Sequence, residues 1–68
     1  MKRQTLIDLR KTKELTQSQI ADKLGVSQSA VAMWETGETR PSLDNIDKLS
    51  KILNVSLKKL LDVFLTED

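Results

Sequence analysis

The stretch TQSQIADKLGVSQSAVAMWETG, residues 16–37, decides the fold, because its pattern predicts two short helices joined by a tight turn. Thr16 is a natural N-cap, and Gln19 completes a capping box, so a helix is expected to begin there. Apolar residues then recur at helical spacing until Gly25, which can adopt positive φ and end the helix. Ser27 is the next cap, which leaves a short break that turns two helices sharply against each other.

The second helix of this pair has two contrasting faces when its residues are placed about 100° apart. Ala30, Val31 and Trp34 lie on one face, which we assign to the core. The other face carries short or amide-bearing side chains without charge: Gln28, Ser29, Ala32, Met33 and Thr36. Charged residues make up 31% of the chain, and their long side chains normally cover a solvated helix. Small groups and amides instead allow close approach to base edges in a DNA major groove.

The ordered features from about Leu6 to Leu61 resemble the DNA-binding domain of phage repressors, Cro proteins and Xre-like bacterial regulators. The matching features are TQ at 16–17, IA at 20–21, LGVS at 24–27, WE at 34–35 and RP at 40–41, then two leucine-rich segments. The resemblance implies an all-α fold, a compact five-helix helix-turn-helix domain of the lambda repressor type. We expect one domain, residues 1–68, with helices at about 4–13, 17–24, 28–35, 43–53 and 57–65.

The helix that starts at Gln28 is expected to act as the recognition helix in double-stranded DNA. Gln28 has the amide geometry for bidentate recognition of adenine, and Ser29 can bond a base or a phosphate. Ala32 and Met33 offer apolar surface that suits a thymine methyl group. Because long polar side chains are few on this face, we expect DNA shape to contribute to specificity.

Four further residues are candidate contacts to DNA phosphates: Gln17, Thr36, Arg40 and Ser42. Gln17 lies in the first turn of a helix and Ser42 caps another, where exposed backbone N–H groups suit an anion. The resemblance implies that Gln17 bonds the DNA backbone and braces Gln28, and that Arg40 grips the strand beside the groove. Alternatively, Gln17 and Arg40 are indifferent residues that face solvent.

Arg10 lies on the inner face of the first expected helix with Leu6 and Leu9, where an unpaired guanidinium is costly to bury. Its expected partner is Glu35, next to Trp34, and the resemblance implies the same pairing. This ion pair is expected to orient the recognition helix. Alternatively, Arg10 extends to water or to a phosphate.

The charge of the chain is unevenly distributed along its length. The formal net charge of +1 argues only weakly for nucleic acid. The first 13 residues contain five cations, Lys2, Arg3, Arg10, Lys11 and Lys13, against Asp8 alone, whereas the last seven residues are net negative. One basic end suits phosphate, although solvated charges that happen to cluster give the same pattern. Residues 1–5 show no firm cap and are expected to fray.

The C-terminal part of the chain predicts two more helices that complete the core. The expected core residues are Leu43, Ile46, Leu49, Ile52 and Leu53 in the fourth helix and Leu57, Leu60, Leu61 and Phe64 in the fifth. Val63, Phe64 and Leu65 together are expected to form the seam of a homodimer. A dimer presents two recognition helices about 34–36 Å apart and requires an approximately palindromic operator.

Composition excludes several classes of function. The absence of cysteine and histidine excludes disulfides and the usual zinc ligands, and no cofactor is expected. No apolar run approaches the length of a membrane span and no secretory signal is evident, so we expect a soluble cytoplasmic protein. The carboxylates are scattered and there is no Gly-rich phosphate loop, so an enzyme is not expected.

The sequence therefore predicts a sequence-specific DNA-binding transcriptional regulator, with repression as the favoured mode. The alternative is an antitoxin-like or accessory protein-interaction module that uses the same fold. Such a module would use the apolar end at residues 63–65 as its contact.

Overall fold

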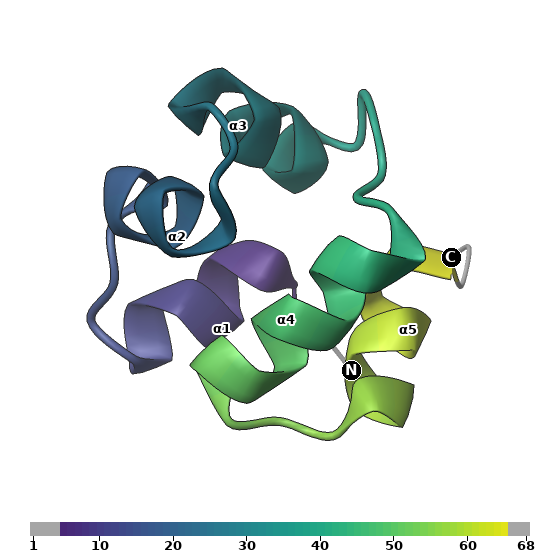
Figure 1. The fold of residues 1–68 in the computed structure, drawn as a ribbon. Helices are drawn as coiled ribbons and strands as arrows, with labels where there is room; N and C mark the ends of the chain where they lie inside the picture. Colours follow the sequence, from purple (N-terminus) through teal and green to yellow (C-terminus); the bar gives the residue numbers. More distant parts are fainter. Residues whose placement is uncertain (1–4, 66–68) are drawn as a thin grey trace.

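Five hydroxyl side chains start the five helices of the computed structural model, which describes residues 5–65. Each accepts a hydrogen bond from the backbone N–H three residues later, as an N-cap does: Thr5, Thr16, Ser27, Ser42 and Ser56. The helices are α1 Leu6–Thr12, α2 Gln17–Leu24, α3 Gln28–Thr36, α4 Leu43–Leu53 and α5 Leu57–Leu65 (Figure 1). No strand occurs in this part of the chain, which confirms the expected all-α class.

The first helix begins at Leu6, later than the expected start near residue 4, because Thr5 is its N-cap. Thr5 and Asp8 form a reciprocal capping box, in which each backbone N–H donates to the other side chain at 3.1 and 3.3 Å. The expectation that residues 1–5 contain no firm cap was therefore wrong at Thr5, and residues 1–4 lie outside the described range. Asp8 takes the place that Glu or Gln usually holds in this motif.

Helices α2, α3 and α4 end at residues that adopt positive φ. Gly25 (φ 73°) ends α2, Gly37 (φ 85°) ends α3 and Asn54 (φ 56°) ends α4. Glu14 (φ 55°), between α1 and α2, is the residue of this group whose side chain disfavours the left-handed region. Gly25, Gly37 and Asn54 thus readily adopt the left-handed conformation that their turns require, whereas Glu14 adopts it against its own preference.

The core lies where α2, α4 and the inner faces of α1, α3 and α5 meet. Helix α2 packs against α3 and α4, α4 packs against α5, and α1 packs against α3. In Figure 1, α3 lies along one edge of the molecule, with α4 and α5 on the opposite side of the core. The buried apolar residues are Leu6, Leu9, Ile20, Ala21, Leu24, Val31, Trp34, Ile46, Leu49, Leu53, Leu60 and Phe64. Helices α1 and α4 therefore support the helix-turn-helix pair α2 and α3 on its core side, and one face of α3 is directed outward.

Two residues that were expected in the core lie at its margin. Leu43 is 71% exposed and Leu57 is 42% exposed. Each is the first residue of its helix, and each lies one turn before a buried residue of the same face, Ile46 and Leu60 respectively. The expectation was wrong because helical spacing identifies a face but does not tell how far along the helix the neighbouring elements extend.

Candidate nucleic-acid interface

The outer face of α3 is open to solvent within the described structure. Gln28, Ser29 and Thr36 are exposed, whereas Ala32 and Met33 are half-buried. The opposite face lies in the core, with Val31 fully buried and Trp34 8% exposed. The α3 outer face, defined as Gln28, Ser29, Ala32, Met33 and Thr36, is therefore open to solvent at three of its five residues and partly covered at Ala32 and Met33.

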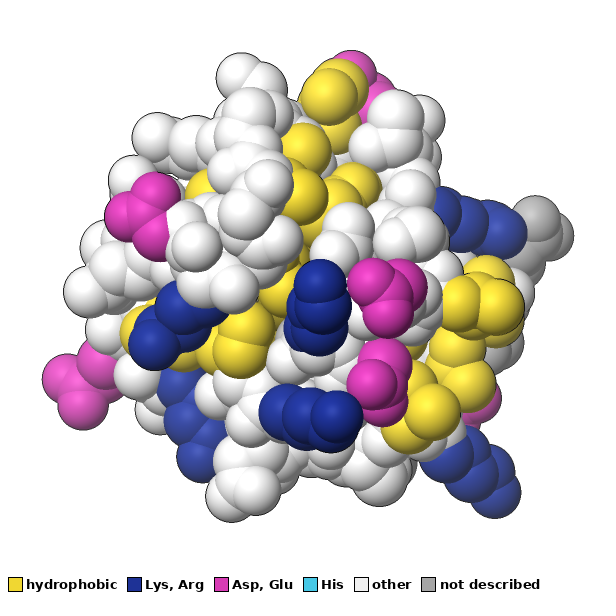
Figure 2. All heavy atoms as spheres, viewed as in Figure 1, with side chains coloured by type: hydrophobic (Ala, Val, Ile, Leu, Met, Phe, Trp, Pro, Cys, Tyr) yellow, Lys and Arg dark blue, Asp and Glu magenta, His cyan; other side chains and the backbone are white. Residues whose placement is uncertain are grey.

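This face differs in charge from the rest of the visible surface. In Figure 2, the region where Figure 1 places α3 consists mainly of uncharged side chains and backbone. Lysine and arginine side chains lie mainly lower in the same view, over the other helices. The α3 outer face is thus free of charged side chains, and any charge that attracts an anion would have to come from the borders of the face.

A partly buried ion pair ties α3 to α1. The Arg10 Nε atom donates to Glu35 Oε2 at 2.6 Å, and Arg10 Nη2 lies 3.4 Å from Glu35 Oε1. A third guanidinium nitrogen, Nη1, donates to the carbonyl of Leu15 at 3.0 Å. The Glu35 side chain is only 3% exposed and that of Arg10 15%, so each charge needs the other to compensate for lost hydration. The structure thus contains the orienting pair that the sequence suggested.

Two glutamines extend this ion pair to the α3 outer face. The side-chain amide nitrogen of Gln17, in α2, donates to Glu35 Oε1 at 2.7 Å. The amide nitrogen of Gln28 in turn points at Gln17 Oε1, at 3.5 Å. The sequence suggested a link between Gln17 and Gln28 through the family resemblance, but it missed the contact between Gln17 and Glu35. No local signal exists for that contact, because the residues are 18 apart and meet only when α2 packs against α3.

The four candidate phosphate contacts lie at the two ends of α3. Gln17 is beside the N-terminal end, whereas Thr36, Arg40 and Ser42 follow one another at the C-terminal end. The Ser42 oxygen accepts from the N–H of Asn45 at 3.2 Å, so its own proton remains available for a phosphate. The Thr36 hydroxyl instead donates to the carbonyl of its own helix at 3.1 Å. Thr36 must release that bond before it can donate to a phosphate.

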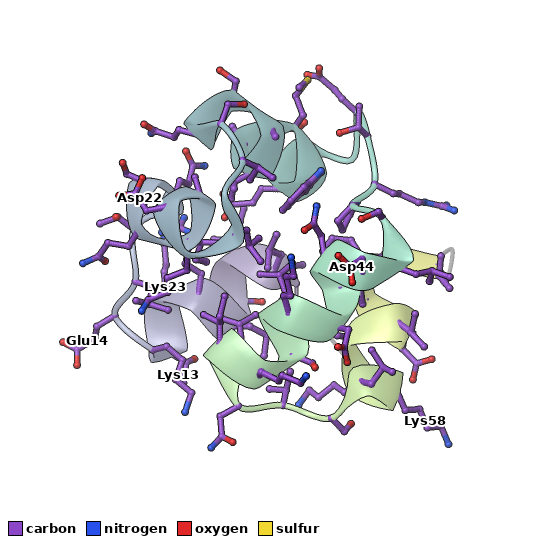
Figure 3. All side chains as sticks on the ribbon, in the orientation of Figure 1. Lys13, Glu14, Asp22, Lys23, Asp44 and Lys58 are labelled. Atoms are coloured by element: carbon purple, nitrogen blue, oxygen red, sulfur yellow. The ribbon has the colours of Figure 1, made fainter. Side chains whose placement is uncertain are left out.

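The basic N-terminal segment does not lie beside the α3 outer face as far as the structure describes it. Arg10 is engaged by Glu35, and Lys2 and Arg3 lie outside the described residues. Figure 3 shows Lys13 and Lys23 at the side of the molecule away from α3. The interpretation of this segment as a phosphate footprint is therefore corrected for Arg10 and Lys13. The reason is that α1 runs beneath α3, and its C-terminal end points away from the outer face (Figure 1).

The apolar C-terminal segment also differs from the expectation. Phe64 is 8% exposed and belongs to the core, and Val63 packs against the core from its edge. Leu65 is 50% exposed. Consecutive helical residues point about 100° apart, so Val63, Phe64 and Leu65 cannot all lie on one seam. Phe64 is thus unavailable for a seam, and Leu65 carries most of the exposed apolar surface of this segment.

Two negative findings concern residues 5–65 only. Among them, no cluster of carboxylates or other ligand side chains is arranged to hold a metal ion. None of the helices in this range combines the length and the apolar character needed to cross a bilayer.

Comparison with known proteins places this architecture in a family. The family described as "Helix-turn-helix" matches residues 6–60. The transcriptional activator BcrR of Enterococcus faecalis is 39% identical over 82% of this chain and 28% of its own length. The uncharacterized regulator YqaE of Bacillus subtilis is 44% identical over 76% of this chain and 45% of its own. The cryptic phage CTXphi transcriptional repressor RstR of Vibrio cholerae is 30% identical over 97% of this chain and 59% of its own.

The chain spans between about a quarter and three fifths of the length of these relatives. No solved structure gives a significant match. The relatives are named as regulators of transcription, which confirms the expectation of a regulatory domain and not a catalytic one for the matched residues 6–60. The chain belongs to the helix-turn-helix family of Xre-like and phage-repressor DNA-binding regulators.

Proposed function

We propose that this chain binds double-stranded DNA sequence-specifically and regulates transcription by inserting α3 into the major groove of an operator. The relatives include both an activator and a repressor. Repression by occupancy requires no surface beyond the DNA interface itself, so repression is the mode that we propose.

The observation that carries this proposal is the uncharged outer face of α3, which is exposed at Gln28, Ser29 and Thr36. A helix enters the major groove only if its leading side chains are short or can bond base edges. Gln28 and Ser29 are exposed, and Ala32 and Met33 are half-buried beside them. Gln28 is positioned to recognise adenine, Ser29 to bond a base or phosphate, and the two apolar residues to meet a thymine methyl group.

Groups at the borders of the face fix its position on the sugar-phosphate backbone. Ser42 retains a hydroxyl proton to donate, and the Gln17 amide has a second N–H beyond the one used by Glu35. Arg40 is exposed and supplies a positive charge just after α3. Thr36 adds a further donor once it releases its helix carbonyl. These contacts determine register and affinity, whereas the outer face reads sequence.

We further propose that the protein binds as a homodimer, with an approximately palindromic operator. Leu65 is the most exposed apolar residue of the C-terminal segment, with Val63 at the edge of the core beside it. A twofold axis near this segment would present two α3 helices about one helical turn of DNA apart.

Selection of bound duplexes from a random library tests the proposal directly. We expect an enriched motif with two related half-sites for the wild-type chain. Gln28→Ala should flatten the preference at one base position of each half-site, a discrimination of about 1–3 kcal/mol. Arg40→Ala should weaken binding to all duplexes alike and reduce the salt slope by about one. Undiminished discrimination in Gln28→Ala would show that base reading was assigned to the wrong residue.

A further inference from the structure

Two hydrogen bonds link Glu35 to Gln17 and Gln17 to Gln28, and in each the glutamine amide nitrogen is the donor. Their direction determines which way the Gln28 amide faces when the protein binds DNA. We infer, on the basis of the proposed base-reading role of Gln28, that the buried carboxylate of Glu35 sets the orientation of the Gln28 amide through Gln17. Glu35 is then a positioning residue for specificity that touches no DNA. Its side chain is 3% exposed and lies on the inner side of α3, with Arg10 against it.

The first step is the polarity of Gln17. A carboxylate that is paired with a guanidinium can only accept hydrogen bonds, and Glu35 Oε2 accepts from Arg10 Nε at 2.6 Å. Gln17 must therefore turn its NH2 group toward Glu35, as the 2.7 Å contact between Nε2 and Oε1 shows. The carbonyl oxygen of Gln17 is then directed away from Glu35. A reversed Gln17 amide would place two oxygens against each other.

The second step transmits this polarity to Gln28. The outward oxygen of Gln17 can only accept, and the Gln28 Nε2 atom lies 3.5 Å from it. Gln28 therefore directs its NH2 group toward Gln17 and its oxygen Oε1 away from it. The Gln28 amide then has one N–H and its carbonyl oxygen left for DNA, with the N–H on the side of Gln17 and the oxygen on the far side.

The third step is the base that this order fits. Adenine presents an acceptor, N7, and a donor, the N6 amino group, in the major groove. With the Gln28 NH2 group near Gln17, N7 is met on the side of Gln17 and the amino group on the far side. We call the hydrogen-bonded series Glu35, Gln17 and Gln28 the relay. Its direction thus distinguishes an A·T pair from a T·A pair at the same position. It also holds the Gln28 side chain in place before DNA arrives, which lowers the ordering cost of binding.

Two variants separate the relay from the base contact. Gln17→Met breaks the relay and leaves the ion pair of Arg10 and Glu35 in place. Arg10→Met with Glu35→Gln removes both charges and gives position 35 an amide that satisfies either orientation of Gln17. The matched control is Lys51→Met with Asp47→Asn, which removes the exposed ion pair of α4 at 3.3 Å without changing net charge.

The measurement is the ratio of the dissociation constants for two duplexes that differ only by A·T or T·A at the position identified with Gln28→Ala. We expect this ratio to fall about 2- to 12-fold in both relay variants, the range set by the ordering cost of one side chain. The control should keep the wild-type ratio. A lost phosphate contact in Gln17→Met lowers affinity for both duplexes equally, so it does not move the ratio.

A second measurement follows the Gln28 side-chain amide by NMR in the DNA-free protein. Its resonances should shift in both relay variants and stay in place in the control, even where the thermal midpoint of unfolding is unchanged. A purely structural role for Glu35 would lower the midpoint of unfolding and leave the Gln28 resonances of the folded protein in place.

The outcomes distinguish this inference from the proposed function. If Gln28→Ala preserves discrimination at every position, the base-reading proposal fails, and the relay fails with it. If Gln28→Ala abolishes the ratio while Gln17→Met preserves it and the Gln28 resonances, only the relay is overturned. If the double variant does not fold, Gln17→Met alone decides, because it retains the ion pair.

Discussion

Helices α3 and α4 both pack one apolar face against the core, but their solvent-facing sides differ in charge. Both bury one apolar face, which contains Val31 in α3 and Leu49 in α4. The solvent side of α4 carries two ion pairs at i,i+4 spacing, Asp44 with Lys48 at 3.5 Å and Asp47 with Lys51 at 3.3 Å. Figure 3 shows Asp44 at the start of α4, pointing away from the core. The α3 outer face contains no charged residue at all.

The contrast shows what a merely solvated helix face looks like in this sequence. Charged side chains cover α4, where water is the only neighbour that the described structure provides. The lack of charged side chains on the α3 outer face is the contrast on which the proposal of close contact with DNA rests. The ion pairs differ in burial as well. The pair of Arg10 and Glu35 is largely buried and joins α3 to α1, whereas the two pairs of α4 are exposed.

The largest difference is expected when one partner of each kind of ion pair is removed. Glu35→Ala leaves the partly buried Arg10 without a counter-charge and should lower the free energy of unfolding by about 3–5 kcal/mol. Asp47→Ala removes an exposed helical pair worth only about 0.3–0.5 kcal/mol. Urea denaturation of the two variants measures both values. Equal losses would show that the pair of α3 has no special role in stability.

A change of one negative unit in the charge of each solvent-facing helix surface sharpens the comparison at the level of binding. Ser29→Glu adds a negative charge to α3, and Lys48→Gln changes α4 by the same amount. Both should alter unfolding free energy by no more than about 0.5 kcal/mol, because both positions are exposed. Ser29→Glu should weaken binding to the selected duplex by about 1–3 kcal/mol, the scale of one mismatched base pair.

Fluorescence anisotropy with the selected duplex compares the two charge variants at one salt concentration. Lys48→Gln is expected to bind close to the wild-type level. Similar losses in both variants would mean that net charge, and not the α3 outer face, controls binding.

The smallest effect concerns the ends of the helices. Helix α4 ends at Asn54, which tolerates positive φ, whereas the connection after α1 places Glu14 at φ 55°. Glu14→Gly should raise the free energy of unfolding by about 0.5–1 kcal/mol, since relief of strain outweighs the added freedom of the unfolded chain. Thermal denaturation measures the gain, and Asn54→Gly serves as the control with a smaller change. Figure 3 shows Glu14 pointing away from the body of the protein, so DNA binding should not change.

Much of the fold was accessible from local patterns. The capping pairs at Thr16 and Ser27 and the turn glycines at Gly25 and Gly37 identified the helix-turn-helix boundaries to within a residue. Thr5 was missed because Asp8 is a less usual partner in a capping box. Leu43 was misjudged because periodicity does not report where the neighbouring helices stop, whereas Phe64 was correct as a core residue and wrong only as part of the seam.

The candidate site divides in the same way. The neutral character of the α3 outer face follows from composition and a 3.6-residue period alone. The basic character assigned to the N-terminal segment did not transfer to the site, because Arg10 turned inward and Lys13 lies away from α3. Charge counts along a chain carry no information on which side of the fold each charge will lie.

By itself, the sequence determined the five helices, their N-caps other than Thr5 and the uncharged face of α3, because these depend on groups within about one or two turns of each other. Only the tertiary structure decided that Glu35, already the expected partner of Arg10, also accepts a hydrogen bond from Gln17 of α2, so that the ion pair and the contact between Gln17 and Gln28 form one connected set. Such contacts join residues far apart in the chain. They form only when packing buries the Glu35 carboxylate. A buried carboxylate has lost its hydrogen bonds to water, so nearby protein donors must replace them.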